Sequence, residues 1–285
     1  MTHRRYLGKW ELGCIVFNAL LVKIFTGYPR RFAEICGSGG ALCALVTGAI
    51  FLILFYCALT LYEKRDRLPW ARLWRNHAVR LVVFALATAY FLFSLVYGLR
   101  AFTAVLQLIS YPAAPAWFLM IFFGLGVAAV MFCGVKAVFR MHSLCVLYVG
   151  IVVAVIVITG VKYAEPAHLT PLWGNGPASV LGRGIETLFL YSDAVVVFFL
   201  ASRQRPEVKT RRCAMAGAAA AVILNVAVVL VASMNQPYEV TQTIAVPIYP
   251  LTKVVYFGKF WSRLDALYLI AFLISAMLYL SLELF

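Results

Sequence analysis

The sequence has few acidic residues and no grouping of the side chains that metal sites and hydrolytic enzymes use. Asp and Glu number 11 against 25 Lys and Arg, and only 13% of the 285 residues are charged. The seven cysteines are scattered without a Cys-x-x-Cys pair, and His77 and His142 fall in predicted basic loops with no nucleophile beside them. We therefore expect no metal, no cofactor and no catalytic centre, and the chain is predicted not to be an enzyme.

Long polar segments are also missing, which excludes an ordinary soluble domain. Hydrophobic residues make up 64% of the chain, and the mean hydropathy is +0.91. The net charge of +14 comes from basic residues in short segments between apolar runs, a pattern typical of membrane-protein loops and not of a nucleic-acid-binding surface. No small-residue cleavage site follows the first apolar run, so that run is expected to stay in the membrane.

Eight apolar runs are each about long enough to span a bilayer. The predicted transmembrane helices cover residues 10–28, 40–62, 79–100, 115–138, 143–162, 178–200, 213–234 and 263–285. Basic residues are about twice as frequent in the loops that an N-inside arrangement places in the cytoplasm, so the N-terminus and the C-terminus are both predicted to be cytoplasmic. The apolar stretch 244–260 is broken by prolines, which favours an interfacial or re-entrant segment.

Two of the predicted helices carry residues that interrupt a helix. The first contains Gly27 and Pro29, and the sixth contains Gly182 and Gly184. Interrupted first and sixth helices are expected of a LeuT-like inverted-repeat fold, in which the substrate binds at the breaks. We predict one all-α transmembrane domain over residues 1–285, with a first repeat at about 10–162 and an incomplete second repeat at about 178–285. Alternatively, Gly27 and Pro29 mark only the outer end of the first helix.

Charged residues inside the apolar runs are candidates for function. A carboxylate in hydrocarbon costs roughly 2.5–3.5 kcal/mol, and Asp193 lies deepest in its run. Lys23 in the first helix is its suggested partner, although a lysine near a helix end also reaches toward the interface in many membrane proteins. Glu186 is either a second group for ion coupling or a residue at the outer mouth of the helix.

Several short stretches, taken in order, resemble the endospore germination permease family, which is related to the amino acid/polyamine/organocation transporters. Residues 23–29, Lys-Ile-Phe-Thr-Gly-Tyr-Pro, and the glycine-containing turn that follows at 33–40 look like the family's first helix and its turn into the second. Residues 111–120 resemble the junction of helices three and four, and residues 134–140 the end of helix four. In the later half, residues 182–193 resemble helix six, and residues 247–267 resemble the loop and the start of helix eight.

This resemblance implies a nutrient site between helices one, three, six and eight. Carried over by position, the ligand-binding residues are Thr26, Gly27, Pro29, Phe93, Tyr97, Gly184, Tyr191, Ser192 and Asp193. It also implies the spore inner membrane as the location, and assembly with a larger membrane subunit and a lipoprotein subunit. Family members usually have ten spans, so we expect this chain to lack the last two helices, either because the sequence is cut short or because this member has lost them.

The resulting prediction is a membrane subunit of a nutrient germinant receptor that binds a small amino acid or similar nutrient and signals to its partners. An ion-coupled amino acid permease of the same fold is the alternative, with Asp193 or Glu186 as the titrating group. A third interpretation is an assembly subunit that binds no ligand. The sequence does not separate a neutral from a cationic amino acid as the ligand.

Overall fold

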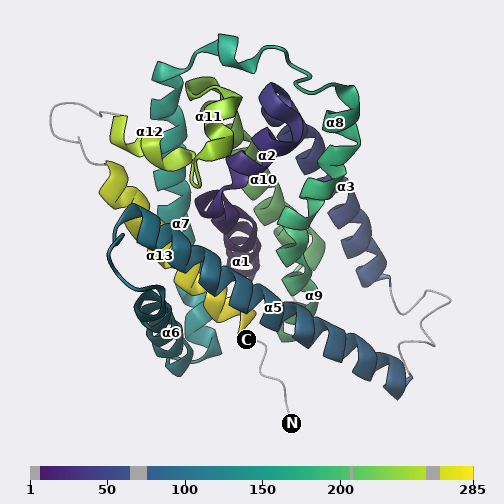
Figure 1. The fold of residues 1–285 in the computed structure, drawn as a ribbon. Helices are drawn as coiled ribbons and strands as arrows, with labels where there is room; N and C mark the ends of the chain where they lie inside the picture. Colours follow the sequence, from purple (N-terminus) through teal and green to yellow (C-terminus); the bar gives the residue numbers. More distant parts are fainter. Residues whose placement is uncertain (1–6, 65–75, 206–207, 255–263, 285) are drawn as a thin grey trace.

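The computed structural model describes residues 7–64, 76–205, 208–254 and 264–284, and these residues form helices and no strand (Figure 1). The longer helices are α3 (Gly40–Glu63), α5 (His77–Ile109), α6 (Ala116–Phe132), α7 (Val135–Gly160), α10 (Thr210–Asn235) and α13 (Leu264–Glu283). Two short helices follow α10: α11 (Tyr238–Thr243) precedes the stretch predicted to be interfacial or re-entrant, and α12 (Ile248–Val254) lies within it. Residues 255–260 of that stretch lie outside the described residues.

Every predicted span falls on a helical segment of the structure. Among the described residues, five segments are long and apolar enough to cross a membrane: residues 28–63, 77–109, 135–163, 210–235 and 264–283. The apolar helix α6 is shorter, at 17 residues. The predicted spans 10–28 and 178–200 are each divided into shorter helices. The all-α membrane class is therefore confirmed, while the inverted-repeat relation, the domain limits and the orientation of the termini stay predictions.

The first span is interrupted in its second half. Helix α1 (Lys9–Leu21) passes into the 3-10 helix η1 (Val22–Thr26), and Gly27 then turns the chain with a φ of 87° before α2 (Tyr28–Cys36). This left-handed conformation is open to glycine and unfavourable for residues with a Cβ atom. Helix resumes for nine residues directly after Gly27, so the glycine joins two helical segments, and the second of them begins the membrane-crossing segment 28–63.

The sixth span is interrupted over a longer distance. A single α-helical stretch, α8 (Pro177–Leu181), ends at Gly182 and is followed by the 3-10 helix η6 (Arg183–Val195) and by α9 (Val196–Leu200). Runs of 3-10 helix longer than three or four residues are uncommon and often mark functional segments. The 13 residues of η6 carry Asp193, so both sequence-predicted interruptions are present in the structure.

The boundary between the fourth and fifth spans differs from the prediction. Helix α6 ends at Phe132, and α7 begins at Val135 after Gly134, which has a φ of 82°. Lys136 and Arg140 therefore belong to the start of α7, and the predicted span 115–138 is too long. His142, predicted to lie in a loop, is buried in α7. The break between α6 and α7 therefore lies at Gly134, and Lys136 and Arg140 are helical and not part of a loop.

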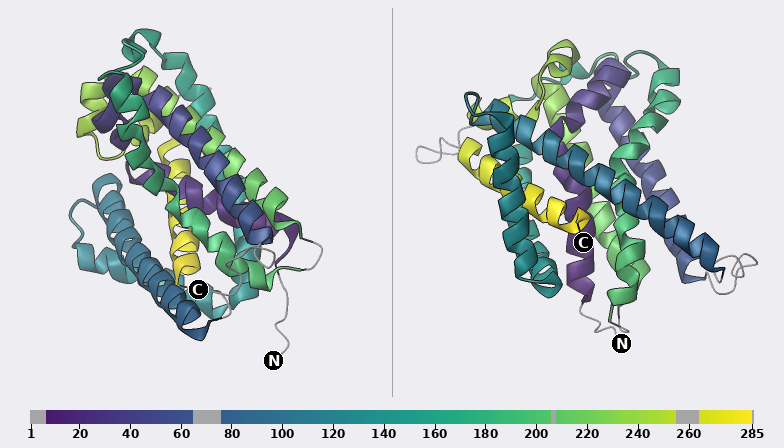
Figure 2. Two further views of the ribbon diagram at one scale, coloured as in Figure 1. Left: turned by 90° about the vertical axis from the view of Figure 1, so that its right-hand side faces the viewer. Right: turned by 60° about the horizontal axis from the view of Figure 1, so that its bottom comes forward.

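Helix α1 lies at the centre of the bundle, packed between α7 and α10 (Figures 1 and 2). A Cβ atom on Gly217 of α10 would lie 2.2 Å from the carbonyl oxygen of Gly13 on α1, so these two helices approach backbone to backbone. Helix α3 packs against α10 and η6, and α13 packs against α5, α6 and α7. The two interrupted segments, η1 and η6, are thereby held inside the bundle.

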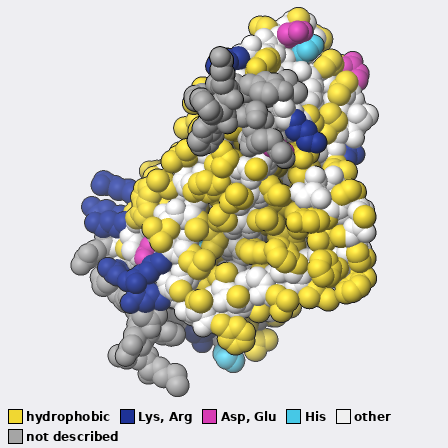
Figure 3. All heavy atoms as spheres, turned by 90° about the vertical axis from the view of Figure 1, so that its left-hand side faces the viewer, with side chains coloured by type: hydrophobic (Ala, Val, Ile, Leu, Met, Phe, Trp, Pro, Cys, Tyr) yellow, Lys and Arg dark blue, Asp and Glu magenta, His cyan; other side chains and the backbone are white. Residues whose placement is uncertain are grey.

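The outer surface is suited to lipid. Figure 3 shows one face covered by hydrophobic side chains, with Lys and Arg gathered at its margins. Large apolar residues are correspondingly exposed along the outer helices, as in Ile53, Phe84, Leu125 and Ile158. A band of this kind bounded by basic residues is the arrangement expected of a membrane-spanning protein.

The conformation of Gly27 gives a stability prediction. Replacing Gly27 with Ala should destabilise the protein by about 1–2 kcal/mol through the left-handed backbone alone, and its Cβ would also lie 2.7 Å from the carbonyl oxygen of Ala245. Gly124→Ala is the control, because a Cβ there meets nothing within 4 Å in a regular helix. Thermal unfolding of the purified variants should show a lower midpoint for Gly27→Ala alone, and equal midpoints would contradict the strained turn.

Candidate functional site

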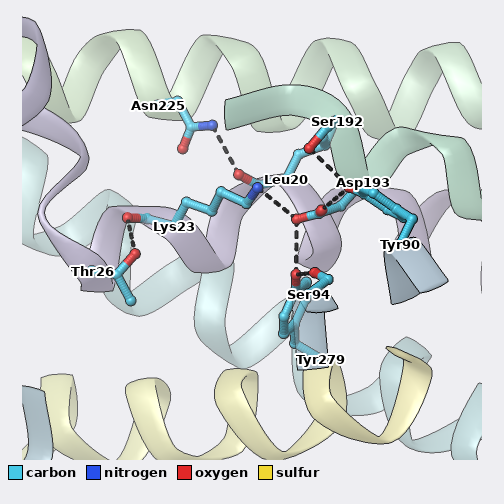
Figure 4. A network of polar contacts seen from close by, with 9 residues as sticks. All are labelled: Leu20, Lys23, Thr26, Tyr90, Ser94, Ser192, Asp193, Asn225 and Tyr279. Carbon is cyan, nitrogen blue, oxygen red and sulfur yellow. Dashed lines mark hydrogen bonds and ion pairs between the residues drawn. The ribbon is translucent and has the colours of Figure 1, made fainter. Parts of the chain in front are cut away.

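A buried ion pair joins the two interrupted segments. The Nζ atom of Lys23 on η1 lies 2.8 Å from Oδ2 of Asp193 on η6. The Asp193 side chain is 1% exposed and that of Lys23 is 19% exposed. Figure 4 shows the Lys23 side chain extended toward the carboxylate. The structure thus contains the charge pair that the sequence suggested, with Lys23 directed to Asp193 and not to a membrane interface.

Hydroxyl groups complete the coordination of the carboxylate. Tyr90 of α5 donates a hydrogen bond to Oδ1 of Asp193 at 2.8 Å, and Tyr279 of α13 donates one to Oδ2 at 3.0 Å. The Tyr90 hydroxyl also lies 2.9 Å from Ser192 Oγ, and the Tyr279 hydroxyl lies 2.8 Å from Ser94 Oγ. Both carboxylate oxygens therefore have partners, which is the condition for keeping a charge inside a low-dielectric bundle.

A cavity of about 570 Å³ opens beside this pair. It lies between η1, the start of α2, the middle of α5, η6 and α13. Its volume is within the range of about 300–1,000 Å³ that is usual for small-molecule sites. Most of its lining is apolar, and its polar members include Lys23, Arg30, Ser94 and Tyr279. The apolar lining includes Val22, Gly98, Ala101, Phe102, Val105, Leu108 and Leu190.

Lys23 and the N-terminus of α2 both contribute to the lining of the cavity. The backbone N–H groups of Tyr28 and Arg30 face no acceptor within α2, because they precede its first complete turn. Such amides and the positive end of the helix dipole favour a carboxylate. At the rim, Glu34 forms ion pairs with Arg30 at 2.8 Å and with Arg31 at 3.1 Å. The arrangement can therefore take a small molecule with an anionic group and an apolar part.

Four of the residues suggested by the sequence line this cavity together: Lys23, Thr26, Gly27 and Tyr97. The Thr26 hydroxyl donates a hydrogen bond to the Lys23 carbonyl oxygen at 3.1 Å, and this bond satisfies one backbone acceptor near the break at Gly27. Pro29 is buried in the first turn of α2; its sequence neighbours Tyr28 and Arg30 line the cavity, and Pro29 itself does not. Neither Ser192 nor Asp193 lines the cavity, and Asp193 adjoins it through Lys23.

Two suggested residues lie behind the cavity, on the side of α3. The Tyr191 ring stacks on Phe51 with ring centroids 4.5 Å apart, and its hydroxyl is hydrogen-bonded to that of Tyr28. The carbonyl oxygen of Gly184 accepts a hydrogen bond from Thr47 at 3.2 Å. Both residues fix η6 against its neighbours, and neither is part of the cavity wall.

Two further suggested residues lie away from the cavity. Phe93 is predicted to form a wall, but its side chain is 71% exposed on the outer face of α5 and it stacks on Tyr97. Of the two residues of α5 suggested as walls, Tyr97 therefore lines the cavity and Phe93 does not; α5 is apolar all round, so its pattern does not show which side faces inward. The Glu186 side chain is 54% exposed, and its Oε1 lies 3.8 Å from Nε of Arg183, near the start of η6. It takes no part in the pair of Lys23 and Asp193.

The tyrosine and serine neighbours of Asp193 are not indicated by the sequence. Tyr90, Ser94 and Tyr279 lie in apolar runs where such residues are ordinary interior or interface side chains. Their spacing gives one weak signal, since Tyr90 and Ser94 are four residues apart and share a helix face. No pattern in the sequence indicates that this face meets η6.

The family described as "Spore germination protein" matches the chain over residues 6–285. The chain belongs to the spore germination protein family. A search among curated proteins found no match. The match covers nearly the whole of this germination protein, including both interruptions, the ion pair and the cavity. It is thus a membrane protein of a germination permease family, and the family is not one of enzymes.

The ion pair of this germination protein should show strong coupling. Asp193→Asn and Lys23→Met should each destabilise the protein by about 3–5 kcal/mol, because each leaves one buried charge without its partner. The double variant should cost less than the sum of the two, because it leaves neither charge. Thermal or denaturant unfolding of the four proteins of this cycle gives the coupling energy.

The exposed pair formed by Arg183 and Glu186 provides the control cycle. Surface pairs contribute at most about 1 kcal/mol, so Arg183→Met and Glu186→Gln should be nearly additive. Additive effects at Lys23 and Asp193 would show that the two charges are stabilised independently.

Proposed function

We propose that this chain is the membrane subunit of a nutrient germinant receptor, and that it binds a small amino acid or a similar nutrient in the cavity beside the break at Gly27. The observation that carries the proposal is the juxtaposition of this cavity with the Lys23 ammonium and the N-terminus of α2. The family match supports a role in germination, and the cavity supports a ligand small enough to fit 570 Å³.

The chemistry of the lining favours an amino acid with a small apolar side chain. The ligand carboxylate would bind the first-turn amides of α2 and Lys23, where two sources of positive potential converge. Backbone carbonyl groups at the C-terminal end of η1 would accept hydrogen bonds from the ligand ammonium. The apolar side chain would lie against Phe102 and Val105 of α5.

Binding at this position would be signalled through the interrupted helices. Lys23 belongs both to the cavity and to the pair with Asp193, so a ligand carboxylate that draws Lys23 toward itself changes the contacts of η6. A larger membrane subunit and a lipoprotein subunit are the proposed partners that receive this change, and the spore inner membrane is the proposed location.

The ligand can be identified by a thermal-shift screen of amino acids on the purified protein in lipid nanodiscs. A ligand present at 100 times its Kd stabilises the folded state by about 2.7 kcal/mol, which is a readily measured shift. Small neutral amino acids should give the largest shift. Ala101→Leu should abolish it, because the added side chain occupies the cavity.

The matched control is Ala85→Leu, which adds the same atoms to an exposed position of the same helix. This variant should keep the full ligand shift. If no amino acid shifts the melting temperature, or if Ala101→Leu retains the shift, the cavity is not the nutrient site and the assembly-subunit interpretation is favoured.

The buried ion pair also favours a second candidate, an ion-coupled amino acid permease. Buried ionisable groups in membrane helices often belong to transport pathways. Uptake of labelled amino acid into proteoliposomes, lost in Asp193→Asn, would support transport. Ligand binding without uptake would support the receptor.

A further inference from the structure

A second carboxylate is buried in the bundle, and it has no partner of opposite charge within bonding distance. Glu283 lies in the last turn of α13 and is 5% exposed. Neither of its carboxylate oxygens meets a donor with hydrogen-bond geometry, although the Ser94 and Tyr279 hydroxyls lie close enough to act on it, and no ion pair reaches it from the described part of the chain. An ionised carboxylate left in this state is strongly unfavourable, so Glu283 requires either a proton or a counter-charge.

Glu283 also lines a separate cavity. This cavity measures about 410 Å³ and lies between α5, α9 and α13. Its lining is apolar, with Phe84, Phe91 and Phe199, except for Thr88, Arg203 and Glu283 itself. The cavity is on the side of the bundle where the N-terminal segment lies, since the Arg203 carbonyl oxygen accepts a hydrogen bond from Leu7. The nutrient cavity is lined by residues of α2 and η1 and shares no lining residue with this one.

The groups that act on Glu283 come from every neighbouring element. Its electrostatic partners are Asp193 of η6, which repels its negative charge, and Lys23 of η1, which attracts it. Tyr279 stands one turn earlier on α13 and is hydrogen-bonded to Asp193. From α5 come Ser94 and Tyr90, and from the segment after α9 comes Arg203, which lines the cavity. The partly buried ammonium group of Lys23 therefore acts on both buried carboxylates, Asp193 and Glu283.

We propose that Glu283 is a proton-binding site that exchanges protons with the cavity between α5, α9 and α13. A hydronium ion in this cavity gives its proton to the carboxylate, leaving water and a neutral carboxylic acid. The neutral acid removes the repulsion of Asp193 and leaves Lys23 to pair with Asp193 alone.

A proton fits this position better than a metal cation does. Metal cations such as Ca²⁺ require several oxygen ligands, and Glu283 is the only carboxylate among the described residues that line this cavity. Within the described residues, no group of three or more His, Cys, Asp and Glu side chains is placed to hold a metal. The Glu283 carboxylate, in a largely apolar cavity, becomes neutral on binding one proton.

The proton site would also couple ligand binding to pH, and this coupling rests on the proposed function. It links the nutrient cavity to the proton site through the ion pair. Loss of the proton places a second negative charge near Asp193, and the two carboxylates then compete for Lys23. Because Lys23 also lines the nutrient cavity, ligand affinity should depend on the protonation of Glu283.

Infrared difference spectroscopy of the protein in nanodiscs tests the site directly, without any ligand. The wild type should show a carboxylic acid carbonyl band at neutral pH that disappears at high pH. Glu283→Gln should lose this band, and Glu239→Gln, which changes an exposed carboxylate of α11, should retain it. If Glu283→Gln does not fold, Glu283→Asp should instead shift the frequency of the band.

The proposal is overturned if the wild type shows no acid band, which is the result expected if Arg203 neutralises an ionised Glu283. It is also overturned if the band is unchanged in Glu283→Gln or unshifted in Glu283→Asp. The amino acid screen is read separately. Absence of any ligand shift with the band assigned to Glu283 removes the nutrient site and leaves the proton site. A ligand shift in a protein that shows no acid band removes the proton site and leaves the nutrient site.

Discussion

The ion pair between Lys23 and Asp193 is the interaction on which the centre of the structure depends. Its two charges come from segments 170 positions apart in the chain, and both segments are 3-10 helices in a bundle that is mainly α-helical. Each charge is tolerated inside the bundle only because the other is present. The pair therefore fixes η1 against η6, and the position of these two segments sets the shape of the cavity beside them.

The interruptions require further polar partners, because a change from α to 3-10 helix leaves backbone groups without their usual bonds. In a membrane these groups must be satisfied within the protein. Asn225 of α10 donates to the carbonyl oxygen of Leu20 at 3.2 Å, at the point where α1 gives way to η1. Thr47 of α3 does the same for Gly184 of η6. These intramembrane polar residues stabilise the breaks, so the interrupted helices and their amide and hydroxyl partners form one system.

Features of the fold and the site that depend on local chemistry are predictable from the sequence. Glycines at 27 and 182 disfavour helix whatever surrounds them, and the cost of an isolated charge in hydrocarbon favours a pair between Lys23 and Asp193. Features that depend on the rotation of an apolar helix are not predictable. Phe93 and Tyr279 are equally ordinary in sequence, yet one faces outward and the other binds Asp193. Glu283 gives no signal either, because a glutamate at the end of an apolar run resembles a helix end at an interface.

The charge and the size of the cavity beside the ion pair are set by different helices. Its charge comes from η1 and the N-terminus of α2, which are held by the ion pair and cannot change without disturbing it. Its size comes largely from α5, where Gly98, Ala101 and Ala104 present small side chains at the lining while larger ones such as Phe93 face outward. Substitutions on α5 can therefore alter the size of the accepted ligand without touching the ion pair. The size of the cavity and its charge are in this way separable properties of the fold.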